Sequence, residues 1–347
     1  MAKKRIEGDM PCDAGFLVLP ECLDQSYESR MGGCYQISIR LPRFDRGVHT
    51  YNLIAPYTNS RFQAAQDEQD AAEARDAGDS QWGCMQDWSD PKTPEGWETS
   101  EFPPKSFLVE QLRFTTEGAA DNDNELQHTR FHIRDHHAAW WSVLADWIGV
   151  ISNQDLIELG KQRRRSLGLF SMWSTDPEDG QEPGFNSLRM PELRPYVGEP
   201  LTRAQLERCM ALAGEATRPP EAWLMLRDAR SLLNSGEFRR AVLDAGTAAE
   251  IALTAALDRY LAANSSADVA EALMDRSKML QPLKNLAKDL DVAALPERFQ
   301  QRLIEPRNKA VHSGKEMTKD VAEMAVSTTS ELLHTTRPLS DFGFPTV

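Results

Sequence analysis

The chain has 347 residues, with 53 acidic against 39 basic side chains and a formal net charge of −14. This length favours two domains over one core, and the acidic excess argues against a protein that coats nucleic acid, although residues 219–335 are close to neutral and leave room for a local basic site. The five cysteines lack CxxC spacing, no apolar run could span a bilayer, and the N-terminus has no signal-peptide core, so we expect a cytoplasmic protein without a membrane partner.

The first half of the chain predicts an α+β domain over residues 1–173. Alternating apolar and polar residues predict strands at 16–19, 35–41, 50–55, 106–114 and 129–134. A segment rich in Ala, Gln and Glu predicts an exposed helix at 61–77, and the Gly, Pro and acidic residues of 78–104 are typical of a long loop. Asp135 is a candidate N-cap for a further helix. We expect this domain to have a sensing or regulatory role, because of its acidic character and its place ahead of a helical domain.

Three groups of side chains in this half allow both a functional and an ordinary interpretation. Four histidines lie close together in sequence: His128, His132, His136 and His137. No Cys, Glu or further His follows them at a recognisable ligand spacing, so we expect no metal site. Three tryptophans, Trp140, Trp141 and Trp147, could stack on bases but have the spacing of a buried helix face. The basic run Arg163, Arg164 and Arg165 could contact an RNA backbone or form a solvated helix end.

The second half predicts an almost purely helical domain. Residues 174–200, rich in Pro, Gly and acids, predict a linker, and the helical domain is expected at 201–347. Apolar spacing predicts helices at 202–216, 221–235, 237–263, 268–274, 282–290, 296–312 and 319–333. Their short connections are typical of a helical bundle.

A polar cluster stands at the end of one of these helices, in the sequence IEPRNKAVHSGKE at residues 304–316. Asn308 and His312 are four residues apart and share a helix face, whereas Arg307 lies about 140° from His312 on an ideal helix. These residue types suit phosphodiester chemistry, because His can move a proton near neutral pH and the Arg fork matches a phosphate. Pro306 should kink or begin the helix there, and Gly314 can end it.

The residues Arg307-Asn308-Lys-Ala-Val-His312 resemble the R-N-x-x-x-H motif of the HEPN superfamily. The segment GEFRRAVLDAGTAAEIALTAAL, residues 236–257, is similar to the second HEPN helix and carries the polar Glu250 inside an apolar helix. The resemblance covers about residues 219–335 and implies an all-α four-helix bundle. Pro306, directly before the motif, departs from the pattern.

What the resemblance implies is a metal-independent endoribonuclease without a cofactor. HEPN proteins commonly dimerise and bring two motifs together across the interface. By this resemblance, His312 would assist attack of the ribose 2′-hydroxyl or protonate the leaving 5′-oxygen, Arg307 would bind the scissile phosphate, and Asn308 would position these groups. Glu250 would orient His312 or Arg307, and Lys309 would contact RNA.

The implied partners are an RNA substrate, either tRNA or mRNA, a second copy in a homodimer or higher homo-oligomer, and an antitoxin or a phage-derived trigger protein. The implied biological role is that of a toxin or of an anti-phage, abortive-infection effector.

Two alternatives remain open at the level of the sequence. The first is a HEPN-like module without catalysis that serves dimerisation or binds a partner protein or RNA. The second is a surface cluster at a helix end, in which Arg307 forms a salt bridge with Glu305. Glu250 itself could lie partly exposed at the edge of its helix.

Overall fold

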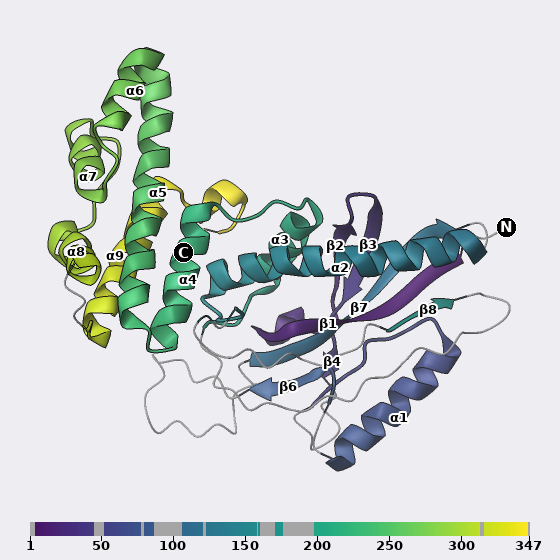
Figure 1. Cartoon of the computed structure of the whole chain (residues 1–347). Helices are drawn as coiled ribbons and strands as arrows, with labels where there is room; N and C mark the ends of the chain where they lie inside the picture. The colour runs from purple at the N-terminus through teal and green to yellow at the C-terminus, as the bar shows by residue number, and fades with distance from the viewer. Residues whose placement is uncertain are drawn as a thin grey trace. The chain divides into compact units, whose positions relative to one another are not determined.

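The protein is described from a computed structural model (Figure 1). The residues described are 4–44, 52–77, 80–86, 106–120, 123–157, 159, 171–175, 198–312 and 316–345. The chain divides into two compact units. Unit 1 combines Met1–Ile148 with Arg164–Arg218, and unit 2 combines Gly149–Arg163 with Pro219–Val347.

Unit 1 is built on an antiparallel sheet. Its strands are β1 (Lys4–Val18), β2 (Ser26–Met31), β3 (Tyr35–Arg40), β6 (Gly83–Gln86), β7 (Ser106–Ala120) and β8 (Ser171–Thr175). The order is β2-β3-β7-β1-β8, and β6 also pairs with β7. A two-stranded sheet joins β4 (Arg43–Phe44) to β5 (Leu53–Ile54), and a 3-10 turn covers Pro20–Cys22. The long central pair β1 and β7 therefore carries most of the unit.

Helices cover both faces of this sheet: α1 (Arg61–Ala77), α2 (Asp123–Ser152) and α3 (Arg203–Gly214). On one face, Trp140 of α2 donates to the Ser29 hydroxyl at 3.0 Å. On the other face, Asp67 of α1 bonds Arg113 at 2.7 Å. The register pairs Ser29 with Ile37 and Ile37 with Thr116. Because neighbouring strand residues face opposite ways, Ser29 and Arg113 point to opposite faces, and so α1 and α2 sandwich the sheet.

Several predictions for unit 1 are confirmed. The helix at 61–77 is α1, the strand at 106–114 lies in β7, and the strand at 35–41 matches β3 to within one residue. The three tryptophans are core residues, with at most 4% of their surface exposed. The predicted strand at 129–134 is wrong, because these residues lie inside α2. That helix begins at Asp123, so Asp135 caps nothing.

The helix α3 packs on the sheet of unit 1. Its Met210 carbonyl accepts a hydrogen bond from the Ser29 hydroxyl at 2.7 Å, and Leu201, just before it, exchanges backbone hydrogen bonds with β1 and Leu19. Thr202 begins the helix with a capping box completed by Gln205. The sequence placed this helix in the domain that starts at residue 201, whereas the structure divides the units after Arg218.

Unit 2 is largely helical. Its helices are α4 (Glu221–Asn234), α5 (Phe238–Asn264), α6 (Ala267–Asp275), α7 (Leu280–Asp289), α8 (Glu305–His312) and α9 (Lys319–Thr336), with a π-helical turn at Gln300–Ile304 and a 3-10 turn at Leu339–Phe342. α4 and α9 pack along α5 (Figure 1). The small buried side chains of α5, such as Ala245 and Ala249, let these neighbours approach closely. Among the described residues, no helix has the length and apolar character needed to cross a membrane.

Candidate functional site

The polar motif lies on the short helix α8, which continues directly from the π-helical turn. In that turn, the amide of Glu305 donates to the carbonyl of Gln300, five residues back. Pro306 has no amide proton to donate and follows closely on the π-helical turn, inside a helix that runs on without a break. The proline is buried and does not break the helix, so the motif stays helical from Arg307 to His312. Single π turns occur frequently beside functional sites.

Arg307 points toward α5 and binds Glu250. Its Nη2 donates to Glu250 Oε1 at 2.8 Å, and the two side chains are 17% and 22% exposed. The same carboxylate oxygen accepts the amide of Leu280, the first residue of α7, at 3.0 Å. Glu250 therefore holds Arg307 and caps a neighbouring helix at once. The alternative pairing with Glu305 does not occur, and Glu250 is neither free nor fully exposed.

A glycine on α5 makes room for the Arg307 side chain. Gly246 lies one turn before Glu250 on the same face, and a Cβ there would meet Arg307 Cγ at 2.7 Å. A second contact fixes the far end of α8, where Arg239 Nε donates to the Ala310 carbonyl at 2.8 Å. The earlier residue of α8, Arg307, contacts the later part of α5, and the later residue, Ala310, contacts Arg239 near the start of α5. The two helices therefore run antiparallel.

The other side of α8 faces solvent. Asn308, Lys309 and His312 are exposed, and so is Val311. Asn308 and His312 are four residues apart and share this open face, as predicted. Arg307 bonds Glu250 instead of turning toward them, and in the described residues no hydrogen bond links His312 to Arg307 or Glu250. A single chain thus presents the arginine and the histidine on different sides of one helix.

Two further sequence predictions concern a basic run and a row of histidines. The basic run Arg163, Arg164 and Arg165 lies outside the described residues, as does Gly314. The histidines His128, His132 and His136 line one side of α2, with ring centroids 6.3 Å and 4.2 Å apart, and Cys34 Sγ lies 3.8 Å from His132 Nε2. Within the described ranges, no group of three or more His, Cys, Asp or Glu side chains could hold a metal ion.

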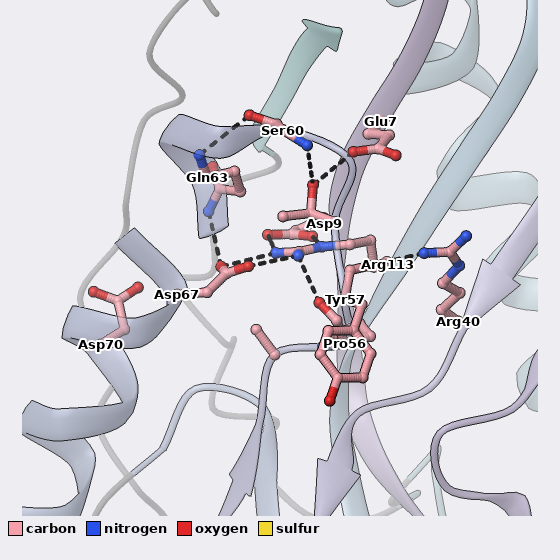
Figure 2. Close-up of polar contacts among 12 residues, drawn as sticks. Glu7, Asp9, Arg40, Pro56, Tyr57, Ser60, Gln63, Asp67, Asp70 and Arg113 are labelled. Carbon is pink, nitrogen blue, oxygen red and sulfur yellow. Dashed lines mark hydrogen bonds and ion pairs between the residues drawn. The ribbon is translucent and has the colours of Figure 1, made fainter. Parts of the chain in front are cut away.

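Unit 1 contains a buried ionic cluster that the sequence did not indicate (Figure 2). Arg113 is 1% exposed and lies between two carboxylates. It donates to both oxygens of Asp9 at 2.8 and 3.1 Å, to both oxygens of Asp67 at 2.7 and 3.0 Å, and to the Pro56 carbonyl at 2.8 Å. All five N–H groups of the guanidinium are therefore used. The cluster ties α1 to the central strands.

A third carboxylate completes this cluster. Glu7, two residues before Asp9 on β1, accepts hydrogen bonds from the Thr58 hydroxyl at 2.6 Å and from the Asn59 side chain at 2.8 Å. Burial raises the pKa of Asp9 to about 6 although Arg113 lowers it. Burial lowers the pKa of Arg113, but the charges and hydrogen bonds of Asp9 and Asp67 outweigh it and leave that pKa raised. Two oppositely placed carboxylates on one saturated arginine are typical of a structural clamp.

Comparisons with known proteins found no relative of this chain. No family model matches it, and neither does any curated protein or solved structure. The case for a function therefore depends on the residues of α8 and the contacts that position them.

Proposed function

We propose that this protein is a HEPN-type, metal-independent endoribonuclease whose active site forms from the α8 motifs of two copies. The supporting observation is the position of Arg307, whose stem passes over Gly246 and whose guanidinium binds Glu250. An acid on α5 that orients Arg307 is what the resemblance to the HEPN superfamily implies. Asn308 and His312 are left on the open face of the same helix, where a second copy and an RNA strand can reach them.

Each residue then has a chemical task. His312 takes the proton of a ribose 2′-hydroxyl, whose oxygen attacks the adjacent phosphorus. The bond from phosphorus to the 5′-oxygen breaks, the leaving oxygen takes the proton that His312 accepted, and a 2′,3′-cyclic phosphate remains. Arg307 stabilises the charge that builds on the phosphate, using guanidinium N–H groups that Glu250 leaves available. Asn308 holds the phosphate or the imidazole in position, and Lys309 contacts the neighbouring backbone.

The Arg307 and His312 groups must come from different copies for this chemistry. One chain presents them on different sides of α8, so a single copy supplies half of each site. A symmetric dimer that faces two α8 helices toward each other would bring the arginine of one copy to the histidine of the other. The proposal thus includes the homodimer, and with it a role as a toxin or an anti-phage effector under control of unit 1.

The test is cleavage of total RNA and of tRNA by the purified protein in the presence of a chelator. Wild type is expected to release products with cyclic phosphate ends, and His312→Ala and Arg307→Ala to lower the rate about 100-fold or more. His128→Ala, which removes an exposed histidine of unit 1, is the matched control and should cleave as wild type does. Equal cleavage by wild type and His312→Ala would exclude the proposed site.

One observation favours a second candidate, a HEPN-like assembly module without catalysis. Glu250 neutralises Arg307 and caps α7 with the same oxygen, so the pair has a sufficient structural reason to exist. In this case, His312→Ala would leave the protein's association with its partner unchanged, and wild type would not cleave RNA under any of these conditions. Analytical ultracentrifugation of His312→Ala and of Arg307→Ala distinguishes a loss of assembly from a loss of chemistry.

A further inference from the structure

Arg230 on α4 is a cation of unit 2 that has no carboxylate partner among the described residues. Its side chain is half-buried, and its Nη2 donates to the Ser330 hydroxyl of α9 at 3.0 Å. Among the described residues, this is the hydrogen bond that Arg230 makes, and no carboxylate pairs with it. Asp228, two positions earlier on α4, is already bonded to Arg227 at 2.7 Å. A partly desolvated guanidinium without an acid is costly, which indicates a ligand that would supply the negative charge.

A histidine lies beside this arginine. His334 is one turn after Ser330 on α9, so the two side chains share a face. Its ring contacts Trp223 edge-on, with centroids 5.0 Å apart, and the indole of Trp223 is itself fixed by a 2.9 Å hydrogen bond to the Arg337 carbonyl. The imidazole is exposed but restrained. Burial lowers the pKa of Arg230 to about 10, and burial together with the charge of Arg230 lowers the pKa of His334.

We propose that Arg230, Ser330 and His334 form a binding site for a phosphate group where α4 packs on α9. The guanidinium offers a fork of N–H donors that matches two phosphate oxygens. Ser330 accepts from Arg230 through its oxygen, so its own proton is available to a third oxygen. The imidazole N–H supplies a fourth donor. These donors come from two helices and suit a tetrahedral oxyanion better than a planar carboxylate.

The site is independent of the motif on α8. Its residues belong to α4 and α9, whereas Arg307 is held by α5. The proposal therefore holds whether or not the protein cleaves RNA. The phosphate can come from a free mononucleotide or from a nucleic-acid backbone, and both present the same oxyanion.

The test is isothermal titration of the full chain with inorganic phosphate, carried out in wild type and in Arg307→Ala so that the α8 motif does not contribute. Arg230→Gln should weaken binding at least 10-fold, and Ser330→Ala and His334→Ala several-fold. Arg276→Gln, which replaces an exposed arginine of unit 2, is the matched control and should bind as wild type does. If Arg230→Gln lowers the thermal stability, Arg230→Lys replaces it, because it keeps the charge and loses the fork.

Two further titrations identify the source of the phosphate. If adenosine monophosphate binds tighter than a 2′-O-methyl RNA strand, the ligand is a nucleotide. If the RNA strand binds tighter, the ligand is a nucleic-acid backbone. In both cases the binding must be weakened by Arg230→Gln. Phosphate binding that is unchanged in Arg230→Gln, Arg230→Lys and Ser330→Ala would overturn the proposal. Acetate that binds as tightly as phosphate would overturn it as well, because the site would then select a carboxylate.

Discussion

Gly246 leaves the space that the side chain of Arg307 fills: a Cβ on this glycine would lie 2.7 Å from Arg307 Cγ. The glycine sits inside a helix, where it costs about 1 kcal/mol relative to alanine. This position on α5 is therefore adapted to the arginine of α8 and not to helix stability.

Gly246→Ala is expected to displace Arg307 from Glu250. The gain in helix propensity and the loss from overpacking, about 1–3 kcal/mol, act in opposite directions, so the free energy of unfolding should change by at most about 2 kcal/mol. RNA cleavage should fall about 10-fold or more, because a misplaced arginine stabilises the transition state less well. Gly236→Ala is not a suitable control, since Gly236 has a positive φ. Ala255→Gly, at an exposed position of α5, is a suitable control, and it should cleave RNA as wild type does.

Two substitutions separate the two roles of Glu250, which are to bind Arg307 and to accept the amide of Leu280. Glu250→Gln keeps an acceptor for the Leu280 amide but loses the charge opposite Arg307, and we expect it to lower the free energy of unfolding by about 1 kcal/mol. Glu250→Ala loses both contacts and should cost about 2–3 kcal/mol. Urea denaturation measures the difference. Equal losses in the two variants would show that the α7 cap contributes nothing.

The proposed composite active site predicts complementation between two inactive variants. Arg307→Ala and His312→Ala, each inactive alone, should recover about a quarter of wild-type cleavage when they are mixed, unfolded and refolded together, because half of the dimers are mixed and each has one intact site. Refolding wild type alone gives the reference rate. No recovery in mixed dimers, with dimerisation verified, would place both residues of one site in the same copy.

The clamp around Arg113 should dominate the stability of unit 1. Arg113→Met leaves Asp9 and Asp67 buried without their cation, and we expect it to lower the free energy of unfolding by about 3–5 kcal/mol. Arg134→Met removes a salt bridge with Asp135 whose side chains are 51% and 62% exposed, and should cost less than about 0.5 kcal/mol. Denaturant titration followed by tryptophan fluorescence compares the two, since Trp82 lies 5.1 Å from the Arg113 guanidinium.

The raised pKa of Asp9 makes this stability depend on pH. The folded state binds the proton with a pKa of about 6, against 3.8 for an ordinary aspartate, so the protonated form favours folding. Stability should therefore fall as the pH rises from about 4 to about 6, by about 3 kcal/mol from this group, and stay level above that. Asp9→Asn should flatten the slope in this window, whatever it does to the absolute stability. An unchanged slope would show that Asp9 titrates normally.

The sequence predicts the helices of unit 2 well, and their local patterns explain why. In α5, buried residues recur with helical spacing over its whole length, and the predicted helix at 237–263 coincides with it to within one residue. In α2, the short run from Thr129 to Arg134 alternates like a strand. The longer spacing of Leu126, Ile133 and Trp140, all buried, has the helical period that decides the structure.

The strands were harder to predict because their residues are atypical. Only the end of β1 was expected, since its first part contains Gly8, Pro11 and Gly15, and the register shifts just after Pro11. In β2, the buried face includes Ser29, a polar residue that pairs with Trp140. The contact of Arg113 with Asp9 joins positions 104 residues apart, and no local pattern can show such a pair. By contrast, the polar Glu250 in an apolar helix gave a visible signal for the site.

The π-helical turn before α8 contains one residue more than an α-helical turn would need, and this extra residue sets which way every later side chain of the helix points. Deleting one residue between positions 300 and 304 would rewind the segment and rotate α8 by about 100° about its axis. The arginine would then leave its acid and a different side chain would take its place beneath α5. The orientation of the whole motif is thus encoded in a single additional residue that lies outside the motif itself.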